Sequence, residues 1–337
     1  MAPAAHPVRR TTVKVVAMSS QGGGSGAYRP RRTILVALAV VAVIAVLVGV
    51  GLGLQRVMAQ ISANTATEGE SLRLENGQLA VVVDDRGRFT MGGVRPVNSL
   101  ADERRAKGTE GPDYEELLAG FPDGFTNSGL LIADTGDAER GLRFGEDGDM
   151  SALPRRVENE RIETAYTYAG GLRITQTIEL GGNSRQATIS YEMRNTSDSE
   201  RNLRARLLMD TLEESPADAA VSVPGVGEVG EPMSINATRL PYVLAIRSEA
   251  AGFTNAYGDL GGEGLREDVL QVGEAAAMRE QGLDYTPGTE PNNVGDGAYG
   301  VLWSRIEIPA GESKTISHSY GLAPDDERAP LPTTVYD

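Results

Sequence analysis

The chain contains no cysteine, and this absence excludes three kinds of chemistry. Without thiols there is no disulfide bond, no cysteine nucleophile and no cysteine-ligated zinc or iron–sulfur centre. Any folded domain must therefore be held together by the burial of apolar side chains.

Histidine and tryptophan are also scarce. His6 lies near the N-terminus, and His318 lies in a segment with the alternation of a strand, so we expect a structural role for His318. We expect Trp303, the single tryptophan, to pack in the core. Residues 92–128 form a segment rich in glycine, proline and charge. We expect its aromatic residues to be more exposed, and they are Tyr114, Phe121 and Phe125.

Acidic residues are absent from the first 54 positions, where six basic residues precede an uncharged run. This run, residues 34–54, has the sequence ILVALAVVAVIAVLVGVGLGL and is long enough to cross a hydrocarbon core of about 30 Å as a helix. The basic residues before it place the N-terminus in the cytoplasm and the rest of the chain outside. The alternative is a signal peptide cleaved after Ala59, but the run is longer than the apolar core of such peptides.

These features predict five segments. They are a cytoplasmic disordered tail (residues 1–32), a transmembrane signal anchor (33–55), a stalk (56–71), a β-sandwich ectodomain (72–322) and a loose C-terminal tail (323–337). An exported domain without cysteine is more typical of a bacterium than of a eukaryotic secretory route.

The predicted outer part is strongly acidic. With 6 of the 32 basic residues before the span and none of the 47 acidic ones, its formal charge is 26 − 47 = −21. Such a surface repels nucleic acid, so we expect no nucleic-acid partner. The expected partners are the membrane, through residues 34–54, and an envelope protein or polysaccharide.

Alternation of apolar and polar residues is clearest between residues 161 and 212. The segments 172–180, 187–194 and 203–210 each have one apolar face and are separated by turn residues, which predicts three antiparallel strands in a meander. Further strands are predicted around residues 79–83, 89–91, 129–133, 142–144, 242–247, 299–307 and 313–320. With one short helix at residues 274–281, this pattern predicts an all-β fold, a large antiparallel two-sheet sandwich.

Several short segments recur in the same order in a known family. They include Asn76–Leu79, Gly87–Thr90, Thr175–Thr177, Arg206–Thr211, Pro224–Gly227, Leu283–Pro287 and Pro309–Ser313. The chain resembles an exported bacterial all-β domain of uncharacterised function, similar in strand pattern to the large galactose-mutarotase-like sandwiches. The resemblance spans about residues 72–322 and implies fold and location, but it implies no catalytic residue.

Acidic residues cluster just past the predicted third strand of the meander. Asp210, Glu213, Glu214 and Asp218 offer hard oxygen ligands at loop spacing and form a candidate Ca²⁺ site. The alternative is that Asp210 pairs with Arg204 or Arg206, which share its face, while the glutamates are solvated. No other cofactor is predicted.

Known catalytic motifs are missing. Residues 225–230 fit G-x-G-x-x-G, but Pro232 follows and no amphipathic helix opens there, so we expect a hairpin turn. Neither G-x-S-x-G nor H-E-x-x-H occurs. The sequence therefore favours a membrane-anchored extracytoplasmic domain with a non-catalytic binding or scaffolding role in the cell envelope. The alternative is a carbohydrate-binding or carbohydrate-processing domain.

Overall fold

The structure is a computed structural model that describes residues 65–67, 69–94, 114–125, 127–135, 141–211, 219–236, 238, 243–248, 253–260, 264–287 and 297–323. The chain divides into two units, residues 1–57 and residues 58–337, and every described residue belongs to the second. The predicted cytoplasmic tail and membrane helix lie outside the described residues, as does the C-terminal tail beyond Ala323. Among the helices that are described, none has the length and apolar character needed to cross a membrane.

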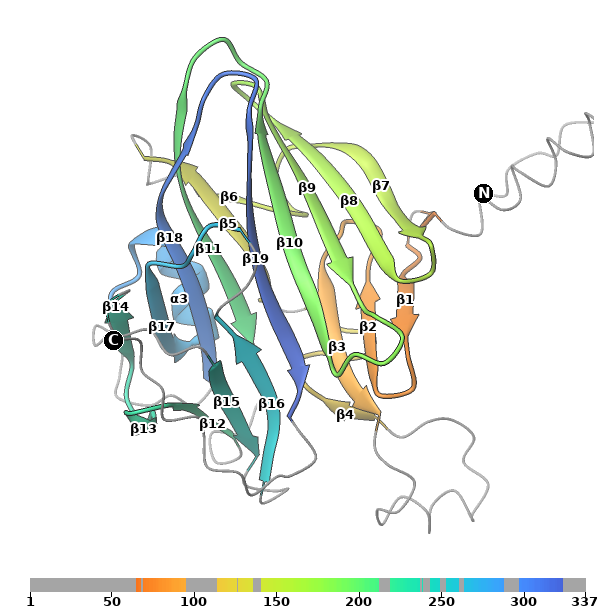
Figure 1. Ribbon diagram of the computed structural model, residues 1–337, viewed down its shortest axis with the longest axis vertical. Helices are drawn as coiled ribbons and strands as arrows, with labels where there is room; N and C mark the ends of the chain where they lie inside the picture. Colours follow the sequence, from red (N-terminus) through yellow and green to blue (C-terminus); the bar gives the residue numbers. More distant parts are fainter. Residues whose placement is uncertain are drawn as a thin grey trace, which may run out of the picture. The chain divides into compact units, whose positions relative to one another are not determined.

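The described residues form three antiparallel sheets (Figure 1). The nine-stranded sheet contains, in spatial order, β13 (Gly227–Glu228), β12 (Ala219–Val223), β15 (Val243–Ser248), β16 (Phe253–Asp259), β19 (Ser313–Leu322), β10 (Gln186–Asn195), β9 (Leu172–Glu179), β8 (Arg161–Tyr168) and β7 (Asp149–Val157). The six-stranded sheet contains β14 (Met233–Asn236), β17 (Val269–Glu274), β18 (Gly297–Ile308), β11 (Arg201–Asp210), β5 (Gly129–Asp134) and β6 (Leu142–Arg143). The four-stranded sheet contains β1 (Leu72–Glu75), β2 (Leu79–Val83), β3 (Phe89–Val94) and β4 (Tyr114–Glu116).

The predicted all-β class is confirmed, but the predicted second sheet is divided in two. The nine-stranded sheet contacts both smaller sheets: Tyr320 on β19 donates a hydrogen bond to the carbonyl of Leu117, just after β4, at 2.8 Å, and His318 on β19 meets Tyr299 on β18. Buried apolar residues from all three sheets form one core cluster. Burial on this scale is what a domain without disulfides requires.

The prediction of a three-stranded meander is wrong at its third strand. β9 and β10 pair as expected, but β10 pairs on its other side with β19, and β11 lies between β18 and β5 in the six-stranded sheet. The chain therefore crosses between sheets after β10, and it does so again between β18 and β19, where the sequence predicts a hairpin. The reason is that β11 is buried along most of its length on both faces, which suits a central strand covered on both sides.

Asn195 holds together these two crossings, which follow β10 and β18 (Figure 1). Its side-chain amide donates hydrogen bonds to the carbonyls of Ser199, at 2.7 Å, and Ile308, at 2.9 Å. Its backbone N–H donates to the carbonyl of Glu312, and its own carbonyl accepts from Gly311. Asn195 is fully buried, so its side chain has a structural role.

The short helix α3 (Ala275–Gln281) and the 3₁₀ turn η2 (Gly282–Asp284) cover the outer face of the six-stranded sheet. The helix is confirmed within one residue of its predicted start. Alternate residues of β11 face opposite ways: Leu207 belongs to the core between the sheets, whereas Leu208 packs with Met278 of the helix. The period of two in the sequence thus predicted the two faces of β11 correctly, although it did not identify the neighbouring strands.

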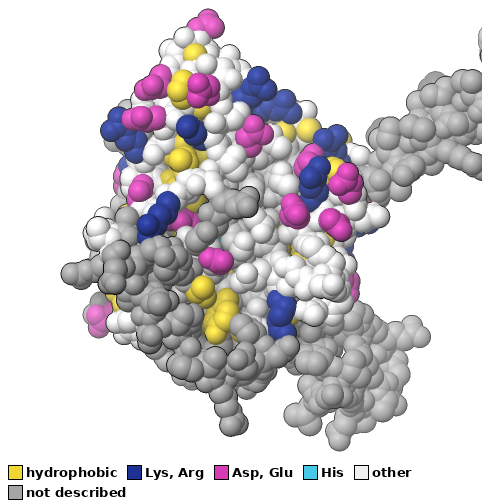
Figure 2. Space-filling view, viewed as in Figure 1, with side chains coloured by type: hydrophobic (Ala, Val, Ile, Leu, Met, Phe, Trp, Pro, Cys, Tyr) yellow, Lys and Arg dark blue, Asp and Glu magenta, His cyan; other side chains and the backbone are white. Residues whose placement is uncertain are grey.

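The ordered domain begins before Leu72. Thr65 forms a β-bridge with Arg155 on β7, and Ala66, which is 1% exposed, donates a backbone hydrogen bond to the carbonyl of Pro154. The last part of the predicted stalk therefore belongs to the fold, because its backbone pairs with a sheet edge. In the view of Figure 2, acidic and basic side chains are scattered over the visible surface of the domain.

Candidate binding site

The predicted calcium cluster is only partly described. Asp210, at the end of β11, is 2% exposed, and its Oδ2 accepts hydrogen bonds from the side-chain and backbone nitrogens of Asn127, at 2.9 and 3.3 Å. Glu213, Glu214 and Asp218 lie outside the described residues. Among the residues that are described, no group of three or more histidine, aspartate or glutamate side chains could hold a metal ion.

The alternative pairing of Asp210 with Arg204 or Arg206 is not found either. Arg204 makes an ion pair with Asp284, 3.0 Å between Nη1 and Oδ1, and also donates to the carbonyl of Leu283. Arg206 donates to the carbonyl of Met278. Both arginines point toward α3 and η2, because the last backbone carbonyls of these elements accept their hydrogen bonds. The sequence pattern of β11 carries no information about these partners.

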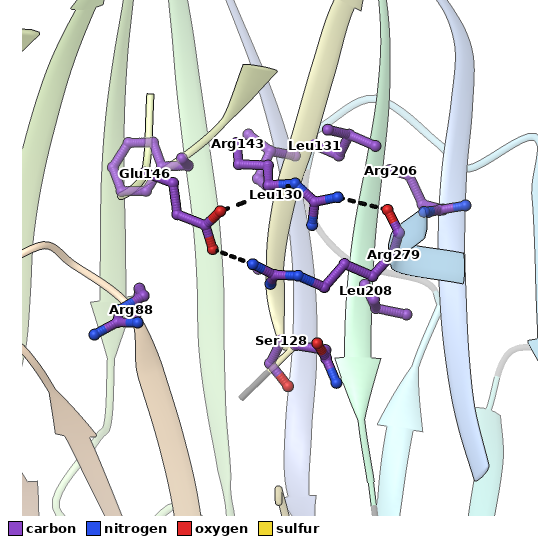
Figure 3. A pocket seen from close by; sticks show the side chains of 12 residues that line it. Arg88, Ser128, Leu130, Leu131, Arg143, Glu146, Arg206, Leu208 and Arg279 are labelled. Carbon is purple, nitrogen blue, oxygen red and sulfur yellow. Dashed lines mark hydrogen bonds and ion pairs between the residues drawn. The ribbon is translucent and has the colours of Figure 1, made fainter. Parts of the chain in front are cut away.

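A hollow lies beside this arrangement, between the beginning of β5, the end of β6, the middle of β11 and the end of α3 (Figure 3). Its polar lining is mostly basic: the charged side chains that border it are Arg88, Arg143, Arg206, Arg279 and Glu146. Asn127 and Ser128 complete the polar wall, and Leu130, Leu131, Phe144 and Leu208 form the apolar part. Four arginines around one hollow are notable in a chain with a formal net charge of −15.

Glu146 bridges two of these arginines. Its Oε1 lies 2.7 Å from Nη2 of Arg279, and its Oε2 lies 3.9 Å from Nε of Arg143. Arg143 also donates to the backbone carbonyl of Arg279, so the β6 arginine holds the last turn of α3 (Figure 3). Burial and the nearby cation of Arg279 lower the pKa of Arg143, while Glu146 and Asp147 raise it. The positive charge is therefore only partly balanced.

Arg206 is the most deeply buried cation of the site, with 1% of its surface exposed. Its stem packs against Gly300 on β18, where an added Cβ would lie 2.9 Å from Cδ, and its guanidinium lies 6.0 Å from the ring centre of Tyr285. Within the described part of the chain, its Nε and Nη1 have no hydrogen-bond partner. Burial, followed by repulsion from Arg143, lowers the pKa of Arg206 to about 10.

The other end of the hollow is formed by Arg88, which comes directly before β3. Its Nε donates to Oδ2 of Asp84 at 2.7 Å, and its guanidinium lies 5.7 Å from the ring centre of Phe125. In Figure 3, Arg88 lies on one side of the hollow, Arg279 reaches across the hollow toward Glu146, and Ser128 lies below Arg279. The side chains thus surround a space that a small group could enter.

The residues singled out as structural in the sequence are confirmed as such. His318 is fully buried, its Nε2 lies 2.6 Å from the hydroxyl of Tyr299, and burial lowers its pKa to about 3. Trp303 is 1% exposed and donates through Nε1 to the carbonyl of Leu265. Neither side chain is accessible to a ligand in this conformation, which argues against an acid–base role for His318.

The glycine-rich segment forms a hairpin, as predicted. The N–H of Val226 donates to the carbonyl of Val223 at 3.0 Å, and β12 pairs with β13 across the turn. Of the aromatic candidates, Phe121 is partly covered, because its ring lies against Gly92 and 5.9 Å from the guanidinium carbon of Arg73. The side chain of Tyr114 lies outside what the structure describes.

No family model and no curated protein matches this chain. Solved structures do. A galactose mutarotase related enzyme from Lactobacillus acidophilus is 10% identical over 77% of this chain and 99% of that chain, with a TM-score of 0.44. A galactose mutarotase-like protein from Lactobacillus casei is 8% identical over 75% of this chain and 100% of that chain, with a TM-score of 0.46. A galactose mutarotase-like protein from Clostridium acetobutylicum is 8% identical over 77% of this chain and 98% of that chain, with a TM-score of 0.41.

The chain is thus similar to galactose-mutarotase-like proteins at low identity, in agreement with the resemblance found in the sequence. These identities and TM-scores are too low to support an argument about activity or ligand. The site must therefore be interpreted from its own residues.

Sequence analysis did not identify the hollow. Its residues come from five separate stretches of the chain, so no local motif joins them. The sequence does not distinguish Arg206 either, because it alternates with apolar residues in the same way as Arg204 on the polar face of this strand.

Proposed function

We propose that this chain is a non-catalytic binding or scaffolding domain of the cell envelope, tethered to the membrane by a helix at residues 34–54 and located outside the cytoplasm. The observation that carries the binding role is the arginine-lined hollow beside α3. Arginine stays protonated at physiological pH, so it can hold a ligand but is a poor proton donor or acceptor in catalysis.

The single carboxylate of the lining, Glu146, is engaged by Arg143 and Arg279. Glycoside hydrolysis in its common form requires two carboxyl groups on opposite sides of the scissile bond. The described lining of the hollow supplies one, and that one is already paired. The geometry therefore supports binding better than hydrolysis.

The membrane tether rests on the uncharged run and the basic residues before it. Protease added to intact cells should release a fragment of the acidic domain, whereas cells opened first should also lose the N-terminal tail. If the domain survives on intact cells and is digested only after lysis, the proposed topology is wrong.

A photo-crosslinking residue at Glu280, an exposed neighbour of Arg279, tests the binding role in the full chain within its native envelope. A defined crosslinked envelope component is expected from position 280 but not from Arg305, an exposed position on β18 that does not line the hollow. Equal products from both positions, or none from either, would contradict a binding role for this site.

A further inference from the structure

We infer that the hollow binds an oxyanion, a carboxylate or a phosphate group carried by an envelope polymer, between Arg88 and Arg279 and above Ser128. This inference rests on the proposed binding function and specifies the chemistry of its ligand. It follows from three features: the charge of the lining, the buried cation behind it, and an internal carboxylate that already occupies part of the site.

The side chains that line the hollow carry a positive charge. Four arginines border the hollow, while Glu146 pairs with two of them and Asp84 with Arg88. Asp147 accepts a hydrogen bond from the backbone N–H of Arg143 and adds a further negative charge nearby. Asp210 is a fourth negative charge, and its Oδ2 accepts from Asn127 of the polar wall. Of these four carboxylates only Glu146 lines the hollow, against four arginines, so the lining itself is positive and would attract an incoming anion.

Arg206 is the second feature. Only 1% of Arg206 is exposed, and two of its three guanidinium nitrogens have no hydrogen-bond partner among the described residues. A buried cation with unmatched donors is costly unless negative charge lies nearby. The guanidinium of Arg206 points away from Glu146 in Figure 3. Arg206 therefore attracts an anion through its electrostatic field and not through a direct contact.

The third feature is Glu146, whose carboxylate bridges Arg143 and Arg279. Arg279 donates to this carboxylate at 2.7 Å, while Arg143 lies 3.9 Å from it, within ion-pair distance only. An external oxyanion would share Arg279 with Glu146 and be repelled by it. Removing the charge of Glu146 should therefore strengthen binding, a result that a purely structural ion pair does not predict.

The experiment titrates the full chain in detergent micelles with glucuronate, glycerol phosphate and, as a neutral control, glucose, and follows binding by calorimetry. Glucuronate or glycerol phosphate should bind and glucose should not, and added salt should weaken binding. Comparison of the two anions identifies which group the site prefers. Arg279→Gln should weaken binding about tenfold, because one charge-assisted contact is lost.

Two variants make the test specific. Glu146→Gln should strengthen anion binding severalfold, and Arg305→Gln, outside the hollow, should leave it unchanged. If glucose binds and the anions do not, or if Arg279→Gln has no effect on anion binding, the oxyanion inference is wrong while the binding function survives. If no probe binds and position 280 yields no crosslinked envelope component, both proposals fail.

Discussion

The hydroxyl of Tyr299 lies 2.6 Å from Nε2 of His318 in the interior of the domain, and this contact joins β18 of the six-stranded sheet to β19 of the nine-stranded sheet. Both side chains are fully buried. A buried imidazole is kept neutral because the protein interior solvates the charged form poorly, which is why the pKa of His318 falls to about 3. His318 therefore stays neutral in the folded domain at any pH above about 3.

His318 should make the domain less stable in acid. The unfolded chain binds a proton at His318 near pH 6.5 and the folded chain only near pH 3, so stability decreases as pH falls through this window. The slope for one such group is at most about 1.4 kcal/mol per pH unit. His318→Gln should flatten the acid limb of the free energy of unfolding, measured by denaturant titration between pH 4 and 7. His6→Gln, at the only other histidine, is the matched control, and an unchanged acid limb in His318→Gln would count against this account.

Glu267 should act in the opposite direction. It is 3% exposed, and burial, with smaller contributions from Asp259 and Asp268, raises its pKa to about 7 from 4.5. The folded chain therefore binds a proton more readily than the unfolded chain, and the associated stability is present below pH 4.5 and lost as pH rises through 7. Glu267→Gln should abolish this loss, so the variant gains stability relative to the wild type between pH 5 and 8. A difference between the two proteins that is constant across this range would contradict the assignment.

The sequence predicted single strands better than their partners. Alternation in residues 172–180 and 187–194 identified β9 and β10 closely, because a half-buried strand shows a period of two. The same alternation could not decide which sheet β11 joins, since pairing depends on contacts far apart in the chain. Leu208, which breaks the polar face of β11, was a local sign that this strand is covered on both sides.

The hollow was beyond sequence analysis for a related reason. Consecutive members of the set Arg88, Arg143, Arg206 and Arg279 are 55 to 73 positions apart in the chain, and only the packing of two sheets and α3 brings them together. In the sequence alone, each of them resembles an ordinary solvated arginine. His318 was assigned correctly from sequence because scarcity and strand alternation are both local properties, whereas a binding site built from distant strands has no local signature.

Asp210 provides a test that separates calcium binding from simple hydrogen bonding. Asp210→Ala leaves the partly buried amide of Asn127 without its acceptor, so we expect a loss of about 1 kcal/mol of stability, with or without calcium. Thermal melts of wild type and variant, each with calcium and with chelator, measure this. If chelator lowers the melting temperature of the wild type but not that of Asp210→Ala, calcium binds at the cluster of Asp210, Glu213, Glu214 and Asp218, because a ligand that binds the folded state raises its stability.

Asn195 should tolerate even an isosteric change poorly. Asn195→Asp replaces an amide that donates to the carbonyls of Ser199 and Ile308 with a carboxylate that repels both oxygens in a fully buried position. We expect a loss of about 3 kcal/mol or more at neutral pH, measured by denaturant titration, with part of it recovered in acid, where the protonated carboxyl can donate one hydrogen bond. Asn183→Asp, in an exposed turn, should change stability by less than about 0.5 kcal/mol. If both substitutions have the same small effect, the two crossings between the sheets do not depend on Asn195, and the connection between β10 and β11 must be held by its backbone pairing with residues 311 and 312 alone.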